Sequence, residues 1–177
     1  MKHILFSLVL LIYSQTFAQN SVDLEPYGSV YDIEDADFQI DLNQEFKAVF
    51  DIASISADRQ SRNRKIETVA RFLKMHHSPQ LENNVVNAAI VIHGSAVYDL
   101  LSHEEYAEFH NQDTLKNPNY DLLTVLSKHD VDIILCGQTS KSRSVDKDMI
   151  HPEVKIALSA MSALIQLQKN GFTPINF

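Results

Sequence analysis

The sequence is poor in cysteine, glycine and proline: its 177 residues include one Cys, four Gly and five Pro. Such low glycine and proline content argues against collagen-like and disordered chains, and one cysteine cannot build a disulfide scaffold. A single cysteine also excludes every motif that needs two, including CxxC redox pairs, cysteine-rich zinc sites and iron–sulfur clusters. With 45% hydrophobic residues, the composition is that of one ordinary globular domain.

Basic residues are also scarce, with 15 Lys and Arg against 23 Asp and Glu, for a formal net charge of −8. This balance argues against a protein that binds nucleic acid through its phosphates. The sequence contains no GxGxxG or P-loop motif, and Gly94-Ser95-Ala96 does not complete the GxSxG motif of serine hydrolases. No metal-ligand spacing is present either, so we expect neither a cofactor nor a metal.

One long apolar run exists, at the very start of the chain. Lys2 and His3 precede apolar residues 4–13, and small residues occupy positions 16 and 18. A basic start, an apolar core and a small-x-small exit are typical of a secretory signal peptide, here residues 1–18. Ten residues span only about half of a bilayer core, so we expect no stable membrane insertion. The prediction is a secreted or periplasmic protein.

The rest of the chain divides into an acidic arm, residues 19–44, and one α/β domain, residues 45–177. The arm shows no helical or strand periodicity, and we expect it to be extended. Its predicted contacts with the domain are made by four side chains: Tyr27, Val30, Tyr31 and Phe38.

Buried strands and amphipathic helices alternate from residue 46 onward. The apolar runs that predict strands are 46–53, 85–92, 131–136 and 154–156, with a last edge strand in 172–177. Helices are predicted between them: around 66–73, over 95–101 with Ser95 as N-cap, from Asn117-Pro118 onward, and from 157 to a stop at Gly171. In the last helix, we expect the stripe that contains Met161 to be core. Residues 102–116 are polar and carry no clear prediction.

Near-continuous apolar strands that alternate with helices predict a mostly parallel sheet covered on both faces. We therefore expect a three-layer α/β/α domain of the flavodoxin-like kind, with four to five strands.

Two reactive side chains close neighbouring strands of this predicted sheet: His93 after the second and Cys136 after the third. Ligands of open parallel sheets bind beyond the carboxyl ends of the strands. Each of the two residues precedes a glycine and a predicted helix start, where free N–H groups and an imidazolium lower the pKa of a thiol. The alternative is a cysteine that is simply buried, because cysteine is among the most buried residue types.

Three segments resemble the DsrE/DsrF-like family, and in particular its exported branch: residues 89–94, Asn117-Pro118-Asn119 with the following strand through 139, and residues 154–172. The resemblance implies a compact α/β/α fold and frequent oligomerisation. Better-studied cytoplasmic relatives relay sulfur as a cysteine persulfide. By this resemblance Cys136 is the sulfur acceptor, with His93, Asn119 and Gln138 lining its pocket. We expect His93 to be catalytic as well, by tuning the thiol or shuttling its proton. Ligand binding is further expected from Gly94 and from the amides of Gly137, Gln138 and Thr139, which would stabilise the anion.

Three possibilities remain open at this stage, and one of them is a structural oligomer in which Cys136 is simply buried. The first is sulfur handling, in which Cys136 forms a persulfide that a donor or acceptor protein exchanges. The second is a binding module, oligomeric and without catalysis, that holds a small ligand or a protein. Whether the protein is an enzyme is left open, and a homo-oligomer is expected in either case.

Overall fold

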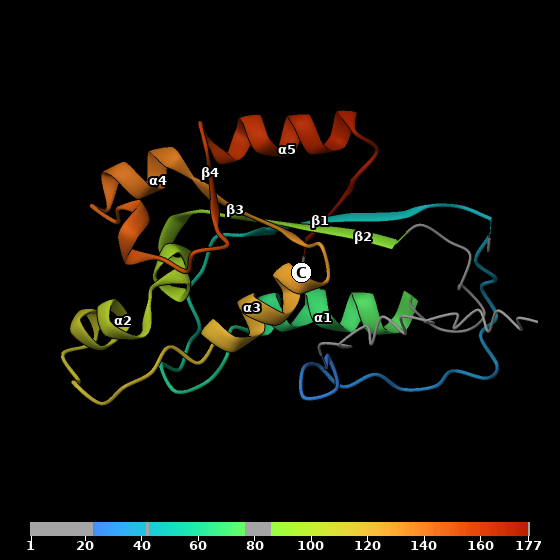
Figure 1. Ribbon diagram of the computed structural model, residues 1–177. Helices are drawn as coiled ribbons and strands as arrows, with labels where there is room; N and C mark the ends of the chain where they lie inside the picture. The colour runs from blue at the N-terminus through green and yellow to red at the C-terminus, as the bar shows by residue number, and fades with distance from the viewer. Residues whose placement is uncertain (1–22, 42, 77–85, 177) are drawn as a thin grey trace, which may run out of the picture.

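A five-stranded parallel sheet lies at the centre of the protein, with strand order β4-β3-β2-β1-β5 (Figure 1). The computed structural model describes residues 23–41, 43–76 and 86–176; the predicted signal peptide, residues 1–18, lies outside them. The strands are β1 (Phe46–Ile52), β2 (Val86–Ile92), β3 (Asp132–Cys136), β4 (Lys155–Ala157) and β5 (Thr173–Ile175). The predicted strands are confirmed, and β5 does occupy an edge.

Helices cover both faces of the sheet (Figure 1). On one face lie α1 (Arg64–His76) and α3 (Tyr120–Lys128), and on the other lie α4 (Gly137–Ser142) and α5 (Ala160–Lys169). The remaining elements are the 3-10 helices η2 (Gly94–Leu100) and η3 (Lys147–Met149), and α2 (His103–Phe109). The predicted three-layer α/β/α fold is confirmed. Within the described residues, no helix is both long enough and apolar enough to cross a membrane.

Alternation along each strand separates two cores, because successive side chains of a strand point to opposite faces. Val49, Ala89 and Val91 face α5, where they pack with Ala163 and Leu167. The residues between them face α1 and α3 in the larger core, which includes Phe50, Ile90, Ile92, Ile133 and Leu135. The sheet therefore carries a thin core beneath α5 and a thick one beneath α1 and α3.

Two helix starts differ from the prediction. Gly94, at φ +58°, turns the chain immediately after β2, so η2 begins one residue early and its N-cap is His93, not Ser95. The Ser95 hydroxyl instead accepts a hydrogen bond from the Ile55 N–H at 3.1 Å. Similarly, α3 begins at Tyr120 with Asn119 as its N-cap, because the Asn117 side chain is bonded to the carbonyl oxygens of Asp99 and Leu101.

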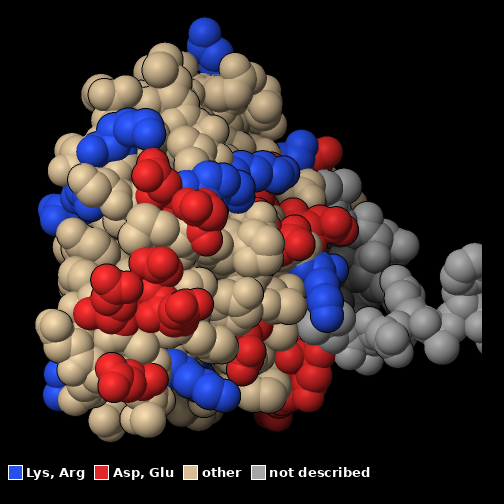
Figure 2. Space-filling model, turned by 60° about the vertical axis from the view of Figure 1, so that its left-hand side comes forward, with Lys and Arg blue, Asp and Glu red and all other residues tan. Residues whose placement is uncertain are grey.

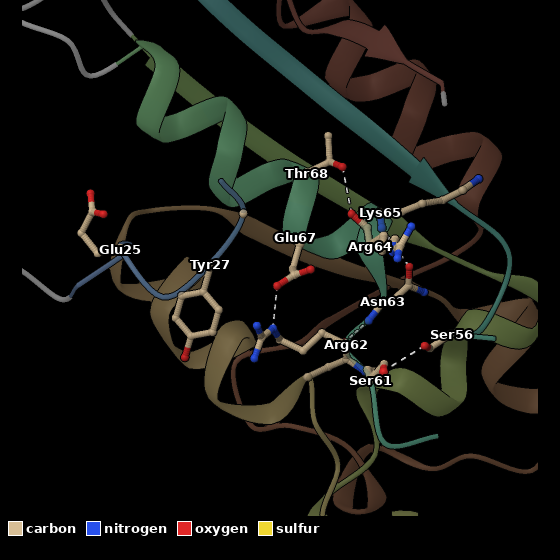
Figure 3. Close-up of polar contacts among 12 residues, drawn as sticks. Glu25, Tyr27, Ser56, Ser61, Arg62, Asn63, Arg64, Lys65, Glu67 and Thr68 are labelled. Atoms are coloured by element: carbon tan, nitrogen blue, oxygen red, sulfur yellow. Dashed lines mark hydrogen bonds and ion pairs between the residues drawn. The ribbon is translucent and has the colours of Figure 1, made fainter. Parts of the chain in front are cut away.

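Among the described residues of the acidic arm, those near its start contact the body of the domain. Leu24 is buried, and the Tyr27 ring lies beside Arg62, whose guanidinium carbon is 5.2 Å from the ring centroid (Figure 3). Val30 is half-buried, but Tyr31 and Phe38 are 77% and 84% exposed, so the expected contacts of these two rings are wrong. Burying them would also draw the neighbouring acidic residues 32–37 out of water, which is costly for charged groups.

The stripe of α5 that contains Met161 is not core. Met161 is 73% exposed, and α5 contacts the sheet with its other side, through Ala163 and Leu167. Both sides of α5 carry apolar residues at helical spacing, so the sequence pattern does not show which side packs against the sheet.

A buried cluster of polar side chains ties the loops together at the carboxyl end of the sheet. The fully buried Asp99 carboxylate accepts hydrogen bonds from the Ser56 N–H (3.1 Å), from Asn63 Nδ2 (2.7 Å) and from Asn119 Nδ2 (3.1 Å). Burial raises the pKa of Asp99 to about 6, although the hydrogen bonds from Asn63, Ser56 and Asn119 oppose the rise. Asp99 thus holds the β1–α1 loop against the start of α3.

Replacing Asp99 by Asn tests this burial cost. The carboxyl pKa of about 6 exceeds its usual value of 3.8, so ionisation costs more in the fold than in the unfolded chain. Wild-type stability relative to Asp99→Asn is therefore greatest below pH 4, and it falls by about 2–3 kcal/mol as the pH rises through 6. Urea denaturation of both proteins at pH 4 and pH 7.5 measures the difference. A difference that grows with pH would mean that the hydrogen bonds outweigh burial.

Candidate functional site

Three side chains point to the same face at one edge of the sheet, the face that α5 covers. Asp51, His93 and Cys136 lie two residues beyond Val49, Val91 and Ile134, which all belong to the core under α5. Because side chains alternate along a strand, all three point to that same face. Ile92 pairs with Leu135 in the parallel register, which places the next residues, His93 and Cys136, side by side. The sheet thus places the two residues that the sequence singled out at the ends of neighbouring strands.

The Cys136 sulfur is surrounded by hydrogen-bond donors from two helices. Cys136 is the N-cap of α4, and although its side chain makes no capping hydrogen bond, the N–H groups of Gln138 and Thr139 in the first turn of that helix lower the pKa of the thiol. The Ala160 N–H, in the first turn of α5, and the Thr139 hydroxyl lower the pKa of the thiol as well. Only 6% of the residue is exposed. The thiol therefore lies in a nearly closed site built of donors.

These donors favour the thiolate form. Burial raises the pKa of the Cys136 thiol, but the hydrogen bonds from Thr139, Ala160 and Gln138 together outweigh burial, so the pKa lies below its ordinary value. A lowered pKa increases the fraction of thiolate at neutral pH, and the thiolate is the nucleophile.

Gly137 makes this site possible because α4 approaches β4 closely. A Cβ at position 137 would lie 2.5 Å from the Ala157 carbonyl oxygen, a distance that backbone atoms cannot tolerate. Any larger residue would push the first turn of α4 away from β4. The Gln138 and Thr139 N–H groups belong to that turn, so their aim at the sulfur depends on glycine at 137.

Asp51 holds the ring of His93. His93 Nε2 lies 2.9 Å from Asp51 Oδ1, and both side chains are about one-third exposed. A carboxylate on one ring nitrogen selects the tautomer and orientation of the imidazole. Sequence reasoning did not single out Asp51, since one aspartate inside an apolar strand carries no motif; only strand alternation could have placed it on the face of His93.

The structure distributes the other predicted site residues between two clusters. Gly94 and Thr139 join Cys136, because the Gly94 N–H donates to Thr139 Oγ1 at 3.3 Å and the same hydroxyl donates to the sulfur. Gln138 contributes its backbone N–H, while its side chain donates to the Leu158 carbonyl at 3.2 Å. Asn119 belongs to the Asp99 cluster, on the side of the sheet that α1 and α3 cover. The expectation that Asn119 lines the thiol pocket is therefore not met.

A metal site does not accompany the thiol. In the part of the chain that the structure describes, no three His, Cys, Asp or Glu side chains group closely enough to hold a metal ion.

The fold and the site define a doubly wound α/β protein whose thiol sits at the carboxyl edge of its sheet. The profile of the DsrE/DsrF-like family matches residues 47–177, and the chain belongs to this family. No match was found among curated proteins.

Two solved structures share the fold. One is protein MTH1491 of Methanobacterium thermoautotrophicum, described as of unknown function, with a TM-score of 0.54 and 18% identity over 74% of this chain and 98% of that one. The other is the ychN protein of E. coli, with a TM-score of 0.55 and 12% identity over 75% of this chain and 100% of that one. At these identities the likeness supports the fold alone.

Thr139→Val tests the hydroxyl that donates to the thiol. Valine has a similar shape but no donor, so we expect the pKa of Cys136 to rise and its alkylation at pH 7 to slow severalfold. Thr139→Ser keeps the hydroxyl and is expected to behave as wild type. Rates of iodoacetamide labelling from pH 5 to pH 10 give the thiol pKa of each protein. Equal profiles for the valine and serine variants would contradict a role for the hydroxyl.

Gly137→Ala tests the close approach of α4 to β4. The added Cβ forces the first turn of α4 outward, and we expect a loss of about 1–3 kcal/mol of stability together with a raised Cys136 pKa. Gly171→Ala is the matched control: its backbone, at φ +90°, is strained by a side chain, but the nearest atom to the Cβ is 3.8 Å away. The control should lose stability and keep the wild-type thiol pKa, as measured by urea denaturation and by labelling. A Gly137→Ala protein with unchanged thiol pKa would contradict the proposed dependence.

Proposed function

We propose that this protein carries sulfur on Cys136 as a persulfide and passes it to a partner protein. The observation that supports this most is the set of donor groups that lower the pKa of the thiol: three N–H groups and one hydroxyl, all from the first turns of α4 and α5. A persulfide, like a thiolate, is an anion at neutral pH, so the same donors stabilise the free and the loaded forms. Membership of the DsrE/DsrF-like family supports the same function.

Loading of the thiolate is a displacement at sulfur. With thiosulfate as donor, the Cys136 thiolate attacks the outer sulfur, the new S–S bond forms, and sulfite leaves with the electron pair of the broken bond. No oxidant is consumed, because the sulfane sulfur arrives already at the oxidation level of the persulfide. The net charge is the same on both sides of the reaction.

Unloading requires a second protein, because Cys136 is the sole cysteine of the chain. A thiolate of the acceptor attacks the outer sulfur of the persulfide, and Cys136 leaves as the thiolate from which it started. Exchange within one chain is impossible, so a sulfur donor or acceptor protein is part of the proposal. A secreted or periplasmic location, predicted from residues 1–18, requires that this partner be exported as well.

In this proposal His93 and Asp51 assist deprotonation of the Cys136 thiol and do not themselves carry sulfur. An imidazole beside a thiol takes up its proton and, once protonated, favours the thiolate. Asp51, bonded to His93 Nε2, orients the ring, and the parallel register supports a position of this pair next to Cys136. His93 therefore acts as the proton acceptor, and Asp51 is its positioning residue.

Sulfur uptake is measured by mass spectrometry of the intact protein after incubation with thiosulfate or polysulfide. We expect one added sulfur atom, absent in Cys136→Ser, because the variant has no thiol to load. His93→Gln is expected to load more slowly near neutral pH, with the difference vanishing at high pH, where the thiol ionises without help. His129→Gln is the matched control on another part of the chain and should load as wild type.

Two results would overturn the proposal. A thiol that reacts with iodoacetamide only above about pH 8.5, the value of a free cysteine, is not activated. A reactive thiol that never gains sulfur favours instead a non-catalytic binding module, in which the donors around Cys136 hold a small anionic ligand.

A further inference from the structure

His151 is a buried histidine that lies outside the two polar clusters described above. It belongs to the segment between η3 and β4 and is 1% exposed. Its ring contacts Tyr120 at the start of α3, with 4.4 Å between the ring centroids. The Tyr120 ring in turn contacts His103 at the start of α2, with 4.5 Å between the centroids. One row of rings therefore joins the starts of α2 and α3 to the segment that leads into β4.

The hydrogen bonds of His151 assign its single proton. The Thr124 hydroxyl donates its one hydrogen to the Tyr120 carbonyl oxygen at 3.2 Å, so it accepts from His151 Nε2 at 2.8 Å. On the other side of the ring, His151 Nδ1 accepts from the Glu153 N–H at 3.3 Å. The ring is therefore neutral, with its proton on Nε2. A second proton would have to bind at Nδ1, where it would face another N–H group.

The surroundings of His151 disfavour that second proton. Burial is the main cause that lowers the pKa of His151 from its usual value of 6.5. Charged groups face the ring from its own segment, from α3 and from α2: Glu153 and Asp121 raise this pKa, whereas Lys147 and His103 lower it. Protonation therefore costs more in the folded protein than in the unfolded chain.

We propose that His151 is an acid-sensitive switch, which holds the entry to β4 against α3 while it is neutral and releases this segment when it is protonated. A protonated ring loses the hydrogen bond from the Glu153 N–H and places a charge in a site that water does not reach. The segment before β4 then loses its contact with α3. The proposal does not depend on sulfur transfer, because it follows from the hydrogen bonds and the burial of His151.

The segment that this switch releases continues into the thiol site. β4 ends at Ala157, whose carbonyl oxygen lies close to Gly137, and the Leu158 carbonyl accepts from the Gln138 side chain at 3.2 Å. Movement of β4 therefore separates it from the first turn of α4. Since Cys136 is only 6% exposed in the closed structure, we expect release of β4 to make the thiol more accessible.

The carboxylates of the protein respond to acid in the opposite direction. Acidic side chains gather in the lower half of the view in Figure 2. On α2, the pKa of Glu105 is raised by burial and then by three neighbouring carboxylates, those of Glu108, Glu104 and Asp148. Acid relieves this repulsion, and protonation of Asp99, whose pKa is raised to about 6, likewise stabilises the fold. Neither accounts for an opening in acid.

His151→Asn is the decisive variant, with His76→Asn as its matched control. The Asn carbonyl oxygen can accept from the N–H two residues on, as His151 Nδ1 does, but it does not titrate. His76 Nδ1 lies 2.8 Å from the Phe72 carbonyl oxygen, which only accepts, so a second proton on that ring leaves this bond in place. His151→Gln is the second variant, in case the shorter side chain prevents folding at pH 7.5.

Hydrogen exchange followed by mass spectrometry, corrected for its intrinsic pH dependence, reports the opening of residues 150–158. From pH 7.5 to pH 4.5 we expect protection there to fall at least about tenfold in the wild type and in His76→Asn, because the unfolded or opened chain binds the proton more tightly. In His151→Asn we expect a change of less than about threefold, since no proton is taken up at this position. Dithiodipyridine, which labels thiols in acid, should react with Cys136 several times faster in the wild type than in His151→Asn at pH 4.5.

Equal protection of residues 150–158 at the two pH values in the wild type would overturn the switch, as would an equal loss of protection in both His151 variants. Sulfur uptake separates this proposal from the previous one. A protein that opens in acid through His151 but never gains sulfur supports the switch and refutes the persulfide. A protein that gains sulfur but keeps its protection in acid refutes the switch alone.

Discussion

Every strand of the sheet runs in the same direction, so the carboxyl ends of β1, β2 and β3 share one edge, and that edge collects the groups around Cys136. Strand alternation then turns Asp51, His93 and Cys136 to the same face. The helices that follow each strand must begin at this edge, which is why their unpaired N–H groups are available there. A thiol at the end of β3 meets two such helix starts, because α4 follows β3 directly and α5 returns from β4. The donor site is a consequence of parallel topology.

The site around Cys136 requires a close approach between the backbones of α4 and β4. The first turn of α4 can reach the sulfur only because Gly137 lacks a Cβ that would strike the Ala157 carbonyl. A second cluster, around Asp99, stabilises the loops of the same edge from the other side of the sheet, at the cost of a buried carboxyl group whose pKa is raised to about 6. The edge is thus built from two polar clusters: one is buried around Asp99, and the other surrounds the Cys136 thiol.

Much of the fold could be predicted because buried parallel strands are nearly continuous apolar runs, and such runs are visible in the sequence. Cys136 and His93 were found for the same reason: each ends an apolar run and precedes a glycine. Asp51 was not predicted as a site residue because it lies within the apolar run of β1. The neighbouring residues in the sequence do not show whether a charged residue there lies at the site or at a solvated edge of the sheet. Asn119 was placed beside the thiol by resemblance, but its amide bonds to Asp99 across the sheet from Cys136. Met161 was expected in the core, since helical spacing identifies an apolar side without showing what lies against it.

The sequence by itself determined the strands, the order of the helices, the family and the identity of the one thiol, because these depend on local periodicity and on residue type. Tertiary structure decided what surrounds that thiol. The Ala160 N–H is 24 positions away along the chain, and the Thr139 hydroxyl reaches both the sulfur and the Gly94 N–H only because β2 and β3 are neighbours. The tertiary structure also decided which side of α5 is buried, because burial depends on how the helix packs against the sheet and not on its sequence pattern. Sequence periodicity acts over a few residues, whereas donors and exposed faces are assembled from segments that meet only after folding.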